Sequence, residues 1–150
     1  MKRRILLVDD DLAVLLTLKA VLELQGFEVD TASSSAEALA RMNSGVYQMV
    51  ISDLRMETEE AGLQVIRAAR RQAYDPATAL LTAFPPSEEN EKGTLRDGED
   101  WTGKNSDSLL IKPIGTRDLL RQVEALLVRH ADRQLRERNA NAQSANHRAG

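Results

Sequence analysis

Short apolar runs that each close on a polar or charged residue are the feature that most constrains this fold. The run at 49–54, Met-Val-Ile-Ser-Asp-Leu, is too short for a helix and places Asp53 at its carboxyl end. Further runs that read as short strands lie at 4–8, 27–31, 77–82 and 109–111. The chain therefore predicts five short strands, most of them buried.

Segments with helical periodicity separate these runs. They cover 11–25, 34–42, 59–73 and the chain from Thr116 onwards. Asp11 is a predicted N-cap, and Ser34 with Glu37 predicts a capping box. Strands that alternate with helices form right-handed βαβ units around a parallel sheet. We therefore expect an α/β fold, a doubly wound five-stranded parallel sheet with helices on both faces.

The composition narrows the function classes. At 150 residues, 42% hydrophobic and 29% charged, the chain suits one globular domain. It has no cysteine, which excludes thiolate chemistry, and its two histidines, His130 and His147, are too few for a His-rich metal site. The N-terminal apolar run stops at Asp9, so it is not a signal peptide. A net charge of −3 gives no general attraction to nucleic acid or membrane, and we expect a cytoplasmic protein.

Two regions depart from the alternating pattern. Residues 85–107 hold two prolines, three glycines and ten charges, and we expect a polar loop or a short irregular helix with Trp101 as a local anchor. No large apolar residue follows Leu135. We therefore divide the chain into a domain at 1–130 and a helical extension at 131–150 that ends in a disordered tail. His130 is expected to be solvated near the end of a helix.

Four strand ends carry the residues that suggest chemistry. Asp9 and Asp10, Asp53, Thr82 and Lys112 follow or close separate apolar runs, and in a parallel sheet these ends share one edge. Three carboxylates together repel one another unless a cation lies among them, and oxygen ligands favour Mg²⁺. A hydroxyl and an ammonium group can hold a phosphoryl group, and a carboxylate can be its acceptor.

Each of these residues also has a plainer interpretation. A lone acid at a strand end is commonly a helix cap or a solvated turn residue, as expected for Asp11. Thr82 alone would be structural, and Lys112 before proline could be a simple surface lysine. The combination at adjacent strand ends, rather than any single residue, favours a phosphoryl site.

Four short motifs stand at these strand ends: Val8-Asp9-Asp10, Ser52-Asp53-Leu54-Arg55-Met56, Leu81-Thr82-Ala83 and Lys112-Pro113. Together they resemble the response-regulator receiver domain of two-component signalling, over residues 3–128 and in the right order. That resemblance implies a flavodoxin-like fold.

The resemblance also implies a role for each residue. Asp53 would accept a phosphoryl group from a phosphohistidine donor, Thr82 and Lys112 would bind that group, and the Lys112–Pro113 bond would be cis. The residues implied to hold Mg²⁺ are Asp9, Asp10, Asp53 and, through its backbone carbonyl, Arg55.

The chain departs from the family pattern in places. Glu57 stands where the family usually has proline, and the usual glycine follows one residue late, at Gly62. Leu109 occupies the position of the family's switch aromatic. Arg55 and Phe84 lie at positions that influence the lifetime of the aspartyl-phosphate in the family.

We expect a stand-alone receiver, not a turnover enzyme. Its partners would be a histidine kinase or histidine phosphotransfer protein and a downstream protein target, with no nucleic acid or membrane, and it could form a homodimer. One alternative is a pseudo-receiver that binds proteins independently of phosphorylation. Another is a haloacid-dehalogenase-like phosphatase, because residues 9–11 offer Asp-x-Asp spacing, although Ala13 does not suit that family and no acidic pair follows Lys112.

Overall fold

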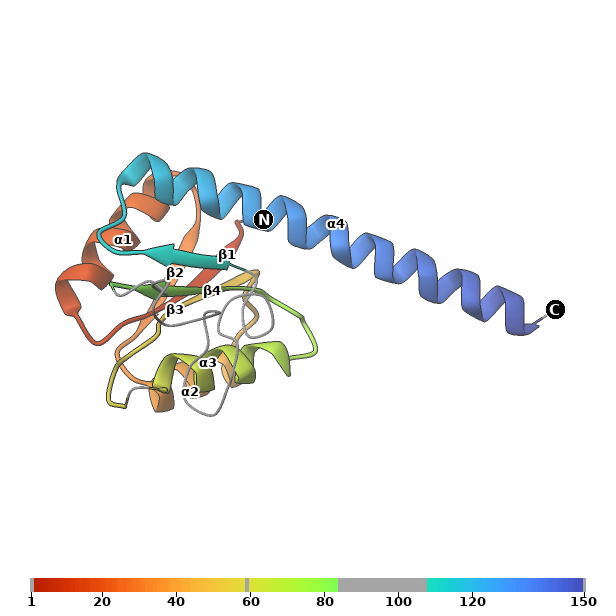
Figure 1. The fold of residues 1–150 in the computed structure, drawn as a ribbon, viewed down its shortest axis with the longest axis horizontal. Helices are drawn as coiled ribbons and strands as arrows, with labels where there is room; N and C mark the ends of the chain where they lie inside the picture. Colours follow the sequence, from red (N-terminus) through yellow and green to blue (C-terminus); the bar gives the residue numbers. More distant parts are fainter. Residues whose placement is uncertain (1, 59, 84–107, 150) are drawn as a thin grey trace, which may run out of the picture.

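Strands and helices alternate along the chain as the sequence predicts (Figure 1). The structure, a computed structural model, describes residues 2–58, 60–83 and 108–149. The expectations for residues 85–107, Trp101 and Phe84 lie outside these described residues. The elements in chain order are β1 (Arg4–Val8), α1 (Leu12–Leu24), β2 (Glu28–Ala32), α2 (Ser35–Ser44), β3 (Met49–Asp53), α3 (Ala61–Arg70), β4 (Ala77–Thr82), β5 (Ser108–Ile111) and α4 (Thr116–Ala149).

The five strands form one parallel sheet in the order β2-β1-β3-β4-β5. This order confirms the predicted doubly wound, flavodoxin-like fold. All of β3 is buried, because it is the central strand and both faces of the sheet are covered. We call the side where the strands end the carboxyl edge, and the side where they begin the amino edge.

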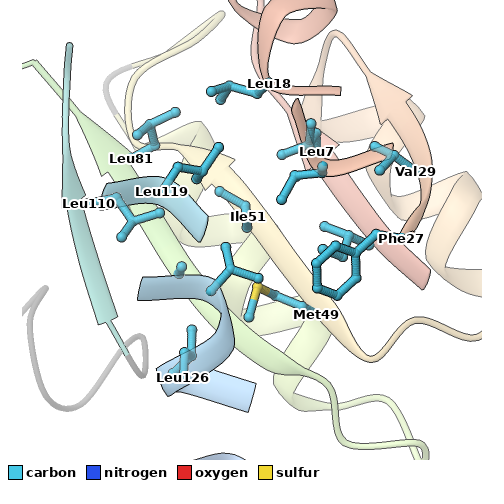
Figure 2. Packing of buried hydrophobic residues seen from close by; sticks show 14 of the residues in the cluster. Leu7, Leu18, Phe27, Val29, Met49, Ile51, Leu81, Leu110, Leu119 and Leu126 are labelled. Carbon is cyan, nitrogen blue, oxygen red and sulfur yellow. The ribbon is translucent and has the colours of Figure 1, made fainter. Parts of the chain in front are cut away.

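Helices cover the two faces of the sheet in pairs, with α1 and α4 on one face and α2 and α3 on the other (Figure 1). Successive strand residues point to opposite faces, so Ile51 joins the core under α1 and α4 whereas Val50 joins the core near α2. Figure 2 shows the first of these cores, in which Leu119 and Leu126 of α4 pack toward Ile51 and Met49. The central strand is thereby held rigidly on both sides.

The predicted helix starts are present. The carboxylate of Asp11 accepts hydrogen bonds from the N–H groups of Ala13 and Val14 at 3.0 and 3.4 Å. The Ser34 hydroxyl accepts a hydrogen bond from the N–H of Glu37 at 3.2 Å. The capping box differs in one respect, because the Glu37 carboxylate accepts from Ser33 rather than from Ser34.

The C-terminal helix differs from the expectation. α4 continues through 34 residues to Ala149, where we expected a disordered tail. No glycine or proline lies between residues 131 and 149, so the local sequence contains nothing that stops the helix. The domain boundary at residue 130 stays a prediction.

The expectation that His130 is solvated was wrong. Its exposure is 7%, because it continues the buried stripe of Leu119, Val123 and Leu126 along α4. Its Nε2 atom lies 2.7 Å from the carbonyl oxygen of Asp75, in the turn before β4.

This turn at the amino edge holds α4 through a second side chain as well. The amide of Gln134 donates to the carbonyl oxygen and to the carboxylate of Asp75, both at 3.1 Å. Asp75 has a backbone φ of 45°, in the left-handed region that non-glycine residues seldom adopt. Two side chains of α4, one helical turn apart, therefore contact this turn.

A second polar cluster near the amino edge joins β1, β2 and the segment before β3. The carboxylate of Asp30 lies 2.8 Å from the Arg4 guanidinium and accepts a hydrogen bond from the Tyr47 hydroxyl at 2.7 Å. Burial raises the pKa of Asp30, but these two partners outweigh burial, so the pKa is lowered overall. Burial and the same hydrogen bond raise the pKa of Tyr47 to about 12. Each charge in this cluster therefore has an opposite charge or a hydrogen-bond donor beside it.

Candidate functional site

Three carboxylates meet at the carboxyl edge. Asp9 follows β1 directly, Asp10 comes next, and Asp53 is the last residue of β3. Each offers an oxygen atom within 4.8 Å of the others. Asp9 is buried at 2% exposure and Asp10 is exposed, so the cluster extends from the interior to the surface.

One ammonium group faces this cluster. Lys112 follows β5, and its Nζ atom lies 2.7 Å from Oδ2 of Asp9 and 3.5 Å from Oδ1 of Asp53. The Lys112–Pro113 peptide bond is cis, as the resemblance implies. With three acids against one lysine, the described part of the site has an excess of negative charge.

The pKa values reflect this imbalance. Burial and then the neighbouring charge of Asp9 raise the pKa of Asp53 to about 6, against the opposing effect of Lys112. Burial lowers the pKa of Lys112, but the contact with Asp9 and the charge of Asp53 outweigh burial and raise it overall. Asp53 and Lys112 therefore both hold a proton more tightly in this site than they do in solution.

The other predicted site residues lie at the same edge. Thr82 is the last residue of β4, one position beyond Leu81, the partner of Asp53 in the sheet. Its carbonyl oxygen accepts a hydrogen bond from the N–H of Lys112 at 2.8 Å. Arg55 lies two residues after Asp53, in the loop before α3. The structure thus places all six predicted residues on adjoining strand ends and their loops.

Close packing of α3 fixes the loop after Asp53. A Cβ atom on Gly62 would lie 2.6 Å from Cα of Leu54 and closer still to the carbonyl oxygen of Asp53. The N–H of Gly62 donates to the carbonyl oxygen of Leu54 at 2.9 Å. Glycine is needed here because no side chain fits between the helix and the strand end.

The donor set fits a hard divalent cation. Its side-chain ligands are carboxylate oxygens, which Mg²⁺ prefers, and the three acids need a positive charge that one lysine does not balance. The backbone carbonyl of Arg55 could add a neutral oxygen.

Comparison with known proteins identifies the family. The response regulator receiver domain matches residues 5–124 of this chain. The chain belongs to the response-regulator receiver family. The receiver is 32% identical over 128 residues to the Haemophilus influenzae "Transcriptional regulatory protein CpxR homolog", covering 85% of this chain and 52% of the relative. It is also 32% identical over 126 residues to the "Transcriptional regulatory protein PrrA" of Mycobacterium leprae, covering 84% and 50%.

Solved structures agree with this assignment. The receiver matches a CheY-like receiver domain protein from Methanospirillum hungatei with a TM-score of 0.72 and 27% identity, covering 89% of this chain and 99% of that one. It matches the response regulator protein TrrA from Thermotoga maritima, a complex with Mg²⁺ and BeF, with a TM-score of 0.66 and 31% identity, covering 83% and 98%.

The curated relatives are longer than this chain. The chain spans about half the length of the first curated relatives that it matches. The expectation of no nucleic-acid partner stays a prediction, since these relatives are named as transcriptional regulators. In the described residues, none of the helices combines the length and apolar character that a membrane crossing requires. Nothing in the matches or the described residues favours the dehalogenase-like phosphatase.

One feature of the site was missed by the sequence analysis. Glu57, noted only as a departure from proline, accepts a hydrogen bond from the N–H of Ser35 at 3.0 Å and contacts the Ser35 hydroxyl. Sequence spacing gave no signal for this pair, because Ser35 begins α2 and Glu57 lies in the loop after β3, 22 positions away.

Proposed function

We propose that the receiver accepts a phosphoryl group on Asp53 from a phosphohistidine of a histidine kinase or phosphotransfer protein. The observation that carries the proposal is the buried Asp53 beside Lys112 and Asp9 at the end of the central strand. A carboxylate oxygen of Asp53 would form the new P–O bond, while the electron pair of the P–N bond returns to the donor imidazole.

The neighbouring side chains would stabilise the charge that moves in this step. The Lys112 ammonium lies close enough to Asp53 to contact an oxygen of the transferred group, and the Thr82 hydroxyl would donate to another. Asp9, Asp10, Asp53 and the Arg55 carbonyl would hold Mg²⁺, which when bound supplies positive charge to phosphoryl oxygens.

A groove beside α1 borders one residue of this site. The groove is mostly apolar, has a volume of about 440 Å³, and is lined by Ala13 and Val14 of α1 and by Lys112 and Pro113. A donor protein with an apolar surface could bind in this groove, next to Lys112.

The test is phosphorylation of the purified chain by acetyl phosphate with Mg²⁺, followed by intact-mass spectrometry. The wild type should gain one phosphoryl group and Asp53→Asn should gain none. Asp11→Asn is the matched control, since asparagine also caps helices and the variant should be phosphorylated as the wild type is. No gain with any donor would overturn the proposal and favour a phosphorylation-independent binding module.

A further inference from the structure

The segment at 32–35, between β2 and α2, touches both loops that carry the proposed metal ligands. On one side, the carbonyl oxygen of Ala32 accepts a hydrogen bond from the N–H of Asp9 at 3.1 Å. On the other side, Ser35 donates its N–H to Oε1 of Glu57, two residues after Arg55. The segment therefore links the Asp9 loop to the Arg55 loop.

The contact at Ser35 is a helix cap supplied by another part of the chain. Ser35 is the first residue of α2, and its N–H is one of the donors that a helix leaves without an internal partner. The helix's own cap, Ser34, is occupied by Glu37. The Glu57 carboxylate fills the vacant place, where a negative charge is also favoured by the helix dipole. Its pKa is lowered, chiefly by the hydrogen bond from the Ser35 hydroxyl.

Further hydrogen bonds shape the loop after Asp53. The N–H of Leu54 donates to the carbonyl oxygen of Leu81 in β4 at 2.9 Å, that of Met56 donates to Thr58 at 3.1 Å, and that of Gly62 donates to Leu54 at 2.9 Å. None of these three bonds joins the loop to the 32–35 segment. The Glu57–Ser35 contact makes that connection.

We infer that Glu57 is a positioning residue for the metal site: by binding Ser35 it holds the Arg55 carbonyl at a fixed place relative to Asp9 and Asp10. The inference rests on the proposed function, because it concerns the same Mg²⁺ site.

Mg²⁺ titration of the unphosphorylated chain by calorimetry tests this inference. Glu57→Ala should weaken Mg²⁺ binding about fivefold, less than the roughly 10–100-fold effect of removing a group that contacts a ligand directly. Glu57→Gln should bind within about twofold of the wild type, because its amide oxygen can accept both hydrogen bonds. Ser35→Ala keeps the N–H donor and should give an intermediate effect.

Ser34→Ala is the matched control. It removes a cap from the same helix but leaves the Glu57 contact in place, so Mg²⁺ affinity should not change. Amide ¹⁵N shifts of Arg55 and Met56 should move in Glu57→Ala and not in Ser34→Ala. These shifts report the loop directly and need no phosphorylation.

Three results would overturn the inference. Unchanged Mg²⁺ affinity in Glu57→Ala would show that the Glu57–Ser35 contact does not position the site. Equal loss in Glu57→Gln would show that only the negative charge matters, and equal loss in Ser34→Ala would show a general effect of α2 stability. If the wild type bound no Mg²⁺ and accepted no phosphoryl group, the proposed function itself would fail.

Discussion

The pKa values of two carboxylates, one near each edge of the sheet, shift in opposite directions. Around the amino edge, Asp30 has both Arg4 and Tyr47 as partners, and its pKa is lowered. At the carboxyl edge, burial and the neighbouring charge of Asp9 raise the pKa of Asp53 to about 6. Asp30 thus has a cation beside it, whereas the three acids of the second edge share one ammonium group among the described residues, that of Lys112.

This difference separates stability from function. A balanced cluster contributes to stability in every state of the protein, since its partners are always present. A cluster with excess negative charge lowers the stability of the protein until a cation or another group binds. Binding relieves the repulsion between the acids, and this relief adds to the affinity for the bound group. The amino edge should therefore lose stability when its polar groups are removed, and the carboxyl edge should gain it.

The largest expected effect concerns backbone fit at the carboxyl edge. Gly62→Ala would force a Cβ atom against Leu54 and Asp53, so the free energy of unfolding should fall by about 3 kcal/mol or more. Urea unfolding followed by circular dichroism measures the change. Gly115→Ala is the control, since a Cβ atom there would meet nothing within 4 Å, and it should change stability by under about 0.5 kcal/mol. Equal stability of the two variants would contradict the close approach.

Next in size is the fastening of α4 at the amino edge. His130→Ala removes a buried ring and its contact with the Asp75 carbonyl, and should cost about 2 kcal/mol in the same unfolding experiment. Val128→Ala, on the same helix but 65% exposed, should cost under about 0.5 kcal/mol. A loss no greater than that of the Val128 variant would mean that His130 does not hold the helix.

The opposite sign is expected for Asp53→Asn. In the absence of Mg²⁺ at neutral pH, removing this charge should raise the free energy of unfolding by about 1–2 kcal/mol. The pKa of Asp53 is raised from 3.8 to about 6 in the folded state, so the free energy of unfolding of the wild type should fall as pH rises through that interval. The difference from Asp53→Asn should develop over the same interval. Unfolding curves at several pH values measure it, and saturating Mg²⁺ should remove the gain. A destabilised variant would show that the carboxyl edge is not strained by its charges.

The smallest effect is expected for Asp30→Asn. Loss of the charged partner of Arg4 should cost about 1 kcal/mol at neutral pH. The lowered pKa of Asp30 means that the wild type keeps this contribution above the unfolded pKa and loses it as pH falls through the folded value. The difference between the two proteins, measured by urea unfolding at several pH values, should therefore shrink in acid. Glu28→Gln, 3.9 Å from the same arginine and more exposed, should show little of this dependence.

The sequence was sufficient to predict the residues at the strand ends. Asp9, Asp53, Thr82 and Lys112 each lie at or just after an apolar run, and a parallel sheet must bring such positions to one edge. Strand alternation and edge geometry are local or topological rules, so no knowledge of packing was needed for the fold or for the gathering of these residues.

Contacts between loops could not be predicted in the same way. The Glu57–Ser35 pair depends on how the loop after β3 approaches the start of α2, and no periodic pattern encodes that approach. His130 differs, since its spacing from Leu126 and Val123 already places it on the buried face of α4. We expected His130 to be solvated because its ring is polar, although its spacing indicated burial. A buried histidine needs only a hydrogen-bond partner, which here is the Asp75 carbonyl.

Because α4 is long, a small tilt of the helix at the amino-edge turn would move its far end. Beyond Gln134, residues 135–149 extend about 22 Å at the helical rise per residue. A tilt of about 10° at the turn would carry the far end of such a rod sideways by roughly 4 Å. The end of α4 lies well past the sheet (Figure 1). A small rearrangement of the turn would therefore displace this end by an amount that a distance probe can measure.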